Sequence, residues 1–286
     1  MPAWDCPDRA DIHAGVQAAL AEDIGSGDLT AALVPAAQQA TATITARQWA
    51  VVCGQAWVEE VFRQLDGRVS VDWQIDEGDE AEPDALIARL AGPARSLLTG
   101  ERTALNFLQL LSGTASAARR CVNTVSGTRV RILDTRKTIP GLRLAQKYAV
   151  RCGGAENHRI GLFDAVLIKE NHIVAAGGIP AAVTAAIRSA GDVLIEVEVE
   201  TLEQVREGLA SGAQRLLLDN FSLEQTREAV VLRDALNPSV TLEASGGITT
   251  ESLRNVAETG VDFISVGSLT KNIEAIDLSM RFSFDA

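Results

Sequence analysis

The sequence predicts an α/β protein in which a region of antiparallel strands and helices precedes a parallel βα barrel. Short apolar runs that do not alternate recur through the second half of the chain, separated by segments of helical character. Such runs are typical of parallel strands that are buried on both faces. The first part contains alternating polar and apolar stretches instead, which indicate half-exposed antiparallel strands. Together these patterns predict two domains.

The N-terminal region is expected to hold a small antiparallel sheet followed by a helix. Alternating stretches lie at Ala40–Ala46, Arg68–Ile75 and Leu86–Leu90, with turns at Gly54, Gly67 and Glu77–Asp79. A helical segment from Glu101 to Arg120 leads into the barrel. We therefore predict a first domain at residues 1–112 and a barrel domain at residues 113–274. Residues 275–286 are expected to pack back onto the first domain.

Six barrel strands are predicted, spaced at about the length of a βα unit. They are Val130–Leu133, Ala165–Ile168, Val193–Val197, Arg215–Leu218, Val240–Leu242 and Asp262–Val266. Helices are expected at Ile179–Ser189, Thr201–Ala210, Leu223–Leu236 and Thr249–Thr259. Thr201 and Thr249 are of the residue type that caps helix N-termini, and a glycine lies near the end of each of these two helices.

A polar residue or glycine closes or follows each predicted strand. These residues are Asp134, Lys169, Glu198, Asp219, Ser245 and Gly267. Because strand C-termini meet on one face of a βα barrel, they are expected to form an active site there. The alternative is that polar residues simply mark where strands emerge into loops. That alternative is adequate for one position but poor for six in succession.

The charge distribution indicates a small anionic substrate. The chain has a formal charge of -12 and a pI of about 4.8, unlike a nucleic-acid binder. Residues 131–172 nevertheless contain two of the three histidines and more basic than acidic residues. Basic groups clustered in an acidic protein focus positive potential over a short range.

Features of secretion and membrane insertion are missing from the sequence. The N-terminal residues contain no apolar signal segment, and no apolar run reaches the length of about 18 residues needed for a membrane span. Cys6, Cys53, Cys121 and Cys152 are widely spaced and are expected to be reduced thiols. Cys152 could be reactive, although a buried thiol is favoured. A cytoplasmic location is therefore expected.

Glycine-rich turns predict a phosphate site after two successive strands. Ser245–Ile248 follows one strand and Gly267–Ser268 the next. Glycines allow backbone N–H groups to approach an anion, and phosphate sites at this place are common in βα barrels. Two ordinary turns that need glycine are the alternative.

Carboxylates at neighbouring strand ends suggest a magnesium site. Glu198 and Asp219 have the oxygen ligands that Mg²⁺ prefers. They could instead act as a general acid and base, or balance Lys137 and Lys169. Glu196 and Glu200 alternate with Glu198 and are expected on the same face of their strand, which favours a function.

Basic side chains are expected to bind the anionic groups, because arginine suits carboxylates and lysine suits phosphates. The candidates are Arg136, Lys137, Arg143, Lys147, Arg151, His158, Arg159 and Lys169. Lys147 and Arg151 could instead form ion pairs on a helix face. Lys169 could be a Schiff-base nucleophile, and His158 either a donor to substrate or a structural residue.

A series of motifs, in order from about residue 20 to residue 271, resembles one enzyme family. The motifs are Glu22–Thr30, Glu101–Asn106, Asp134–Arg143, Lys147–Gly154, Asn157–Arg159, Leu167–His172, Glu196–Glu200, Leu218–Asn220 and Glu243–Ile248. They are similar to those of the quinolinate phosphoribosyltransferase family, the carboxylating nicotinate-nucleotide pyrophosphorylases. Ile139 departs from a threonine that is frequent in the family.

The resemblance implies an N-terminal α+β sandwich-like domain joined to an incomplete, open βα barrel. It implies that quinolinate and phosphoribosyl pyrophosphate give nicotinate mononucleotide, pyrophosphate and CO₂, with Mg²⁺, in NAD biosynthesis. It also implies a homodimer or higher homo-oligomer in which Arg102 reaches the partner's site.

The resemblance also implies a set of site residues. Those implied to bind substrate are Arg102, Thr135, Arg136, Lys137, His158, Arg159, Lys169, Glu198, Asp219, Ser245, Gly246, Gly247, Val266, Gly267 and Ser268. Lys137, Lys169, Glu198 and Asp219 are implied to be catalytic, with Glu198 and Asp219 at the metal, largely through substrate.

Four alternative functions stay open at this point. A nicotinate phosphoribosyltransferase would act on a monocarboxylate, and the abundance of basic groups favours the dicarboxylate instead. A family paralogue associated with molybdenum transport would share the fold. A Schiff-base aldolase would use Lys169. A sugar-phosphate-binding barrel without activity would not explain the polar residues at every strand end.

Overall fold

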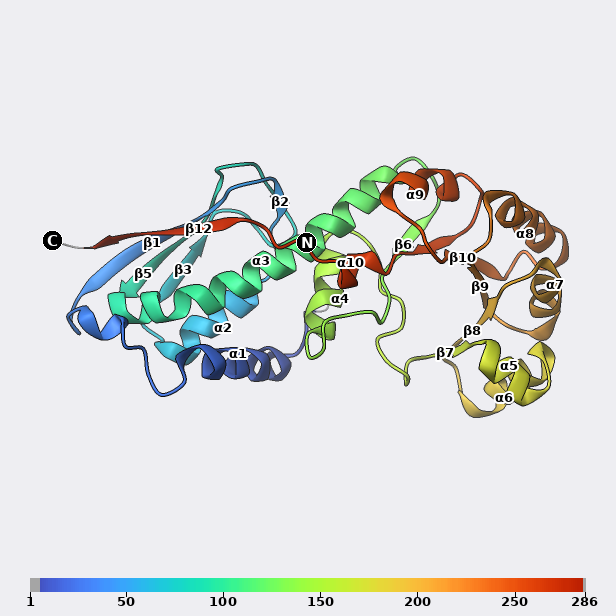
Figure 1. Cartoon of the computed structure of the whole chain (residues 1–286), viewed down its shortest axis with the longest axis horizontal. Helices are drawn as coiled ribbons and strands as arrows, with labels where there is room; N and C mark the ends of the chain where they lie inside the picture. The colour runs from blue at the N-terminus through green and yellow to red at the C-terminus, as the bar shows by residue number, and fades with distance from the viewer. Residues whose placement is uncertain (1–5, 285–286) are drawn as a thin grey trace. The chain divides into compact units, whose positions relative to one another are not determined.

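The computed structural model describes residues 6–284 (Figure 1). The chain forms two compact units. The first unit comprises Met1–Arg119, Thr138–Gly154 and Leu269–Ala286, and the second comprises Arg120–Lys137 and Ala155–Ser268. Two short segments, residues 1–5 and residues 285–286, lie outside the described residues. The expectations for the first residues of the chain and for the last two residues of segment 275–286 are therefore not tested. The division near residue 112 stays a prediction.

The first unit is built on an antiparallel sheet that, within the described residues, has the order β12-β1-β5-β3. The strands are β1 (Gln39–Ala46), β3 (Ser70–Trp73), β5 (Leu86–Pro93) and β12 (Leu278–Phe284), with a separate pair β2 (Ala50–Val51) and β4 (Glu80–Ala81). Alternate residues of β1 are buried, as the sequence pattern predicts. The C-terminal strand β12 pairs with β1, with Ile44 opposite Met280.

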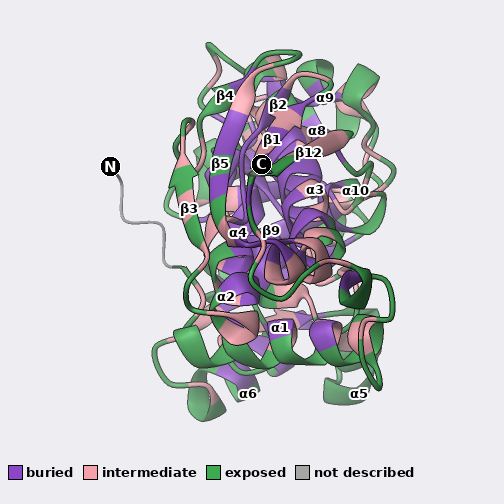
Figure 2. Cartoon of the chain, turned by 90° about the vertical axis from the view of Figure 1, so that its left-hand side faces the viewer, coloured by how far each residue is buried: buried purple, intermediate pink, exposed green. Residues whose placement is uncertain are grey.

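Helices complete the first unit. They are α1 (Arg9–Ile24), the short η1 (Ala31–Leu33), α2 (Gln55–Leu65), α3 (Ala94–Thr124), α4 (Arg143–Cys152) and α10 (Ser268–Lys271). Buried side chains of α1, α2 and α3 form one apolar core with those of β1 and β5. Figure 2 shows the buried residues on β5, α2 and α3 in purple. A Cβ at Gly100 of α3 would lie 2.6 Å from Cε1 of Phe62, so glycine permits the close approach of α3 to α2.

The second unit contains a parallel sheet which, in the described part of the chain, has six strands in the order β6-β11-β10-β9-β8-β7. The strands are β6 (Arg131–Leu133), β7 (Ala165–Ile168), β8 (Leu194–Val199), β9 (Arg215–Asp219), β10 (Thr241–Ser245) and β11 (Phe263–Ser265). All six predicted strands are therefore present. Since β6 and β7 do not pair with each other among these residues, the sheet is an open barrel, which confirms the expected fold class.

The connecting helices lie along the outer side of this sheet (Figure 1). They are α5 (Glu170–Ala176), α6 (Ile179–Ser189), α7 (Leu202–Ser211), α8 (Leu223–Leu236) and α9 (Thr250–Ala257). The side chains of Thr201 and Thr249 accept hydrogen bonds from the backbone N–H groups of Gln204 and Ser252, as predicted for N-caps. No helix within residues 6–284 combines the length and apolar character needed to cross a membrane.

Several elements were not predicted from the sequence. Helices α1, α2 and α5 and the strand β12 belong to this group. Gly54, where a turn was expected, is the residue immediately before α2. The carboxylate of Glu77 caps this helix, because it accepts hydrogen bonds from the backbone N–H groups of Gly54 and Gln55 at 2.8 and 3.1 Å. Lys147 does lie on a helix, α4, but it is almost entirely buried rather than on an exposed face.

Candidate active site

A cavity of about 370 Å³ opens at the carboxyl ends of the strands of the second unit. Its lining comprises Thr135, Arg136, Lys137, His158, Arg159, Leu167, Lys169, Glu198, Leu217, Asp219, Glu243, Ser245 and Ser265. Every strand of this sheet contributes a residue at its end or in the loop that follows, because the strands are parallel and end at one edge. Most of the site residues expected from the sequence therefore meet in one place.

The expected residues that do not line this cavity lie at its margin or elsewhere. Gly267 is close to the site, because a Cβ there would lie 3.3 Å from Cδ of Lys137 and 3.5 Å from Oγ1 of Thr135. Val266 is buried, Ser268 begins the short helix α10, and Gly246 and Gly247 follow β10. Arg102 is an exposed residue of α3 in the first unit.

Lys169 and Glu198 form an ion pair from the ends of neighbouring strands β7 and β8. The backbone N–H of Lys169 donates to Nδ1 of His172 at 3.0 Å, which fixes the first turn of α5 behind it. Asp219, at the end of the next strand, accepts a hydrogen bond from the side chain of Asn220 at 2.8 Å. The two carboxylates retain further acceptor sites on the cavity side.

Asp134 is not a cavity residue, contrary to the expectation that the polar residues at all six strand ends meet in the active site. Its carboxylate is fully buried. It accepts hydrogen bonds from the side chain of Asn157 and the backbone N–H of His158, both at 2.8 Å. Asp134 therefore anchors the loop that carries His158 and Arg159.

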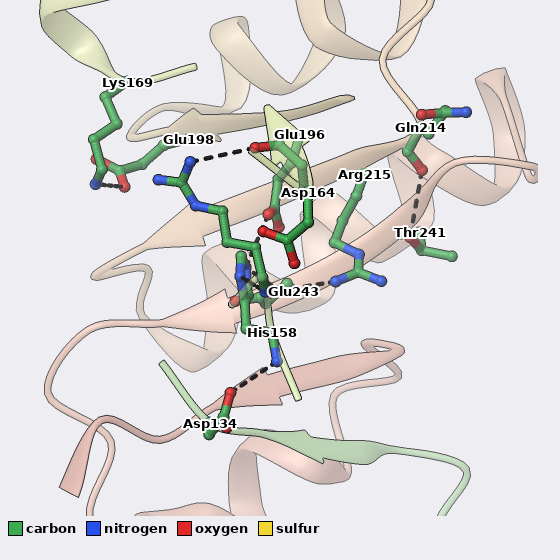
Figure 3. A network of polar contacts seen from close by, with 12 residues as sticks. Asp134, His158, Asp164, Lys169, Glu196, Glu198, Gln214, Arg215, Thr241 and Glu243 are labelled. Atoms are coloured by element: carbon green, nitrogen blue, oxygen red, sulfur yellow. Dashed lines mark hydrogen bonds and ion pairs between the residues drawn. The ribbon is translucent and has the colours of Figure 1, made fainter. Parts of the chain in front are cut away.

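Both ring nitrogens of His158 are engaged by the protein (Figure 3). Nδ1 accepts a hydrogen bond from the N–H of Arg159 at 2.8 Å. Nε2 lies 2.9 Å from Oε2 of Glu196 and 3.4 Å from Oε2 of Glu243. The Nδ1 contact leaves the ring proton on Nε2, where it faces the two carboxylates.

Burial and the neighbouring carboxylates have opposite effects on the pKa of His158. Burial lowers the pKa of His158, but hydrogen bonds with Glu196 and Glu243 outweigh it and raise the pKa to about 9. Burial, together with the charge of Glu243, raises the pKa of Glu196 to about 7. The Nδ1 contact opposes a second proton on the ring, because it uses the Nδ1 lone pair. The contact at Nδ1 therefore places the ring proton on Nε2, next to the two carboxylates.

Arg136 and Arg159 face the same space. Burial, and then the neighbouring positive charge of Arg136, lower the pKa of Arg159. Nη1 of Arg159 also donates to the carbonyl of Ala165 at 3.3 Å, which directs the guanidinium. Two guanidinium groups held close together favour an anion with two negative groups, which would relieve their repulsion.

Comparison with known proteins agrees with this geometry. The C-terminal domain model of quinolinate phosphoribosyl transferase matches residues 114–281, and the N-terminal domain model matches residues 28–112. The chain belongs to the quinolinate phosphoribosyltransferase family. A probable carboxylating nicotinate-nucleotide pyrophosphorylase of Bacillus subtilis is 44% identical, over 91% of this chain and 89% of the relative.

Other members of the family support the same assignment. The carboxylating enzyme of Mycobacterium leprae is 40% identical over 93% of this chain and 95% of its own length. The solved nicotinate-nucleotide pyrophosphorylase of Francisella tularensis superposes with a TM-score of 0.95 at 46% identity, covering 99% of this chain and all of the other.

Membership of the quinolinate phosphoribosyltransferase family confirms the expected reaction and enzyme class. The chain is a pentosyltransferase that transfers a phosphoribosyl group to quinolinate with decarboxylation, in NAD biosynthesis. The alternatives within this fold, a nicotinate phosphoribosyltransferase or a molybdenum-transport paralogue, are not supported by these relatives.

Some lining residues were not predicted, although a simple rule would have found them. Leu167, Leu217, Glu243 and Ser265 each lie two residues before an expected site residue, namely Lys169, Asp219, Ser245 and Gly267. Alternate residues of a strand face the same side, so the cavity extends down these four strands by one such step.

Proposed function

We propose that quinolinate and phosphoribosyl pyrophosphate bind together in the cavity of the second unit. The observation that supports this most directly is the charge pattern of its lining. Arg136, Lys137, Arg159 and Lys169 provide positive charge for carboxylates and phosphates, and Glu198 and Asp219 lie on the neighbouring strands β8 and β9. This pattern suits an anionic acceptor beside a phosphorylated sugar.

The quinolinate half of the cavity is proposed to lie at Arg136 and Arg159. Their guanidinium groups match the two adjacent carboxylates of quinolinate. Lys169 supplies a further charge beside them, and Glu198 holds its ammonium group in place. His158 contributes through the loop that presents Arg159 rather than as a free donor, because both of its nitrogens have protein partners.

The phosphoribosyl pyrophosphate half is proposed to lie at Lys137, Thr135 and Ser245, and at the turns Gly246–Gly247 and Gly267–Ser268. Thr135 Oγ1 accepts the N–H of Lys137 at 3.1 Å and so shapes the loop after β6. The Gly246 and Gly247 backbones both adopt positive φ, which turns backbone groups toward the end of the sheet. Val266 supports the second turn from the core.

Glu198 and Asp219 have the donor set that Mg²⁺ requires. Both are partly exposed carboxylates at strand ends, and each keeps acceptor capacity beyond its one protein partner. We propose that they hold Mg²⁺ mainly through substrate oxygens. The metal would supply neutralisation of the pyrophosphate charge.

The chemistry follows from positioning and charge. As the bond from ribose C1 to pyrophosphate breaks, C1 gains positive character, which Glu198 and Asp219 stabilise electrostatically. The pyridine nitrogen of quinolinate then forms a bond to C1 and becomes cationic. The adjacent ring carbon loses CO₂, keeps the electron pair beside this cation, and takes up a proton from water. No dedicated base is required, so Lys137 and Lys169 act through charge and orientation.

We also propose a homodimer or higher assembly and a cytoplasmic location. In the dimer, Arg102 would complete the partner's quinolinate site, which agrees with its exposure on α3. An exposed arginine with no core role is free to contact another subunit.

The direct test is an assay with purified protein, Mg²⁺, phosphoribosyl pyrophosphate and either quinolinate or nicotinate. Mononucleotide and CO₂ are expected from quinolinate, and no mononucleotide from nicotinate. Chelation of divalent metal should abolish turnover, and restoring Mg²⁺ should recover it. Turnover of nicotinate, or activity that persists in chelator, would contradict the proposal.

A further inference from the structure

The interior of the parallel sheet contains a charged group that the proposed reaction does not use directly. Glu196 and Glu243 are fully buried, on strands β8 and β10. Arg215, on the strand between them, lies 3.3 Å from Glu243 through its Nη1 atom and stacks on the ring of Phe263 at 3.9 Å. Burying two carboxylates side by side is unfavourable, and apolar side chains would fill this space at lower cost.

The carboxylates are not fully used by the protein's own hydrogen bonds. Among residues 6–284, both carboxylate oxygens of Glu196 and Oε1 of Glu243 have no hydrogen-bond partner. The Oε2 atoms of the two residues lie 2.9 and 3.4 Å from Nε2 of His158, within ion-pair distance (Figure 3). Burial of these two carboxylates is unfavourable, yet both lie beside one ring nitrogen of His158. This arrangement indicates that the position of the ring matters for function.

Holding the ring also holds the residue after it. The backbone N–H of Arg159 donates to Nδ1 of His158, so the orientation of the ring fixes the peptide between the two residues. On the other side, the backbone N–H of His158 is bonded to Asp134. The loop is therefore held through three atoms of His158, namely its backbone N, Nδ1 and Nε2. The next residue, Arg159, lines the cavity.

We propose that Glu196 is a positioning residue that, together with Glu243, sets the place of Arg159 in the quinolinate site by holding the ring of His158. This inference rests on the proposed binding of quinolinate at Arg136 and Arg159. It assigns the buried charged group to substrate affinity rather than to the stability of the sheet.

The test compares the affinities of the two substrates. In Glu196→Ala the ring loses the closer of its two carboxylate partners at Nε2, and the KM for quinolinate should rise roughly tenfold or more, the scale of a displaced binding group. The KM for phosphoribosyl pyrophosphate should change less than twofold. Glu196→Gln keeps an oxygen that can accept the Nε2 proton and should recover most of the quinolinate affinity. The control is Glu207→Gln, an exposed residue of α7, which should leave both KM values unchanged.

A double-mutant cycle separates positioning from simple stability. If Glu196 acts through His158, then Glu196→Ala should have no further effect on quinolinate affinity in a His158→Phe background. Equal effects in both backgrounds, or equal rises in both KM values, would overturn the inference. If Glu196→Ala does not fold, the cycle is made with Glu196→Leu, which fills a similar volume and has no acceptor. The wild-type protein is assayed first with quinolinate, so a failure of the proposed function would appear there and not in the variants.

Discussion

The Nε2 atom of His158 lies 2.9 Å from Oε2 of Glu196, which is buried in the middle of strand β8. This contact supports the proposal that His158 is a structural residue rather than a donor to substrate. With Nδ1 accepting from Arg159, neither nitrogen is left to bind quinolinate in this arrangement. We therefore propose that His158 contributes to the site through the loop that carries Arg159.

Arg136→Ala should weaken quinolinate binding by roughly a hundredfold, the usual cost of removing one partner of a charged hydrogen-bonded pair. Arg136 is at the cavity and has no place in the apolar core, so the melting temperature should hardly change. Calorimetric titration with quinolinate and a thermal melt measure the two effects. Arg188→Ala, an exposed arginine on α6, is the matched control and should bind normally. Normal binding by Arg136→Ala would show that the carboxylate assignment is wrong.

Asp219→Asn should lower kcat by about a hundredfold, because it removes a negative charge next to the developing cation at C1. The Kd for quinolinate should stay within a factor of about two, since Asp219 is not assigned to that half of the cavity. If Asp219 helps to hold Mg²⁺, the variant should also need more Mg²⁺ for half-maximal activity. Steady-state kinetics over a Mg²⁺ series give both numbers, and an unchanged kcat would remove Asp219 from the catalytic set.

The barrel strands could be predicted from the sequence because their pattern is local. Strands such as Leu216–Leu218 are apolar on both faces, and a parallel sheet covered on both sides requires this. The helix α2 was missed for the opposite reason. Its N-terminus is capped by Glu77, which is more than twenty residues away in sequence. The N-cap residue Gly54 has no side chain that could indicate the start of a helix.

The sequence allowed one site residue to be predicted for each barrel strand, the polar residue or glycine at its carboxyl end. Polar residues such as Lys169 and Asp219 interrupt apolar runs and are visible in the sequence. Glu243 is also polar, but it lies inside a strand, and its contacts with His158 and Arg215 could not be seen in the sequence. The contact with His158 joins residues that are 85 positions apart in the chain, and periodicity alone does not reveal such a pair.

Gly246→Ala should disrupt the turn after β10. Gly246 has a φ of 93°, and a Cβ there would lie 2.2 Å from Oδ1 of Asn220. We expect a loss of about 1 kcal/mol or more in unfolding free energy and a higher KM for phosphoribosyl pyrophosphate. Gly247→Ala is the matched control, because Gly247 also has positive φ but no atom within 4 Å of an added Cβ. Denaturant unfolding and steady-state kinetics should rank Gly246→Ala as the more severe change, and the reverse order would contradict the steric argument.

The first unit contains a carboxylate whose ionisation should stabilise the fold. Oε1 of Glu60 lies 2.5 Å from Nη2 of Arg63 and 2.7 Å from Nδ1 of His13. The hydrogen bond from Arg63, assisted by those from Gln64 and His13, lowers the pKa of Glu60 to about 2, against the opposing effect of burial. A group with a lowered pKa stabilises the folded chain above its unfolded value, and this contribution is lost as the pH falls toward 2.

Glu60→Gln should therefore remove part of the acid sensitivity of the protein. The wild-type free energy of unfolding is expected to decline between about pH 4.5 and about pH 2, as Glu60 gains a proton only in the unfolded chain at first. The variant should be less stable than the wild type at neutral pH, and the difference should shrink toward pH 2. Urea unfolding at a series of pH values measures both curves. Parallel curves, with a constant difference at every pH, would mean that the charge of Glu60 contributes nothing and that only its shape matters.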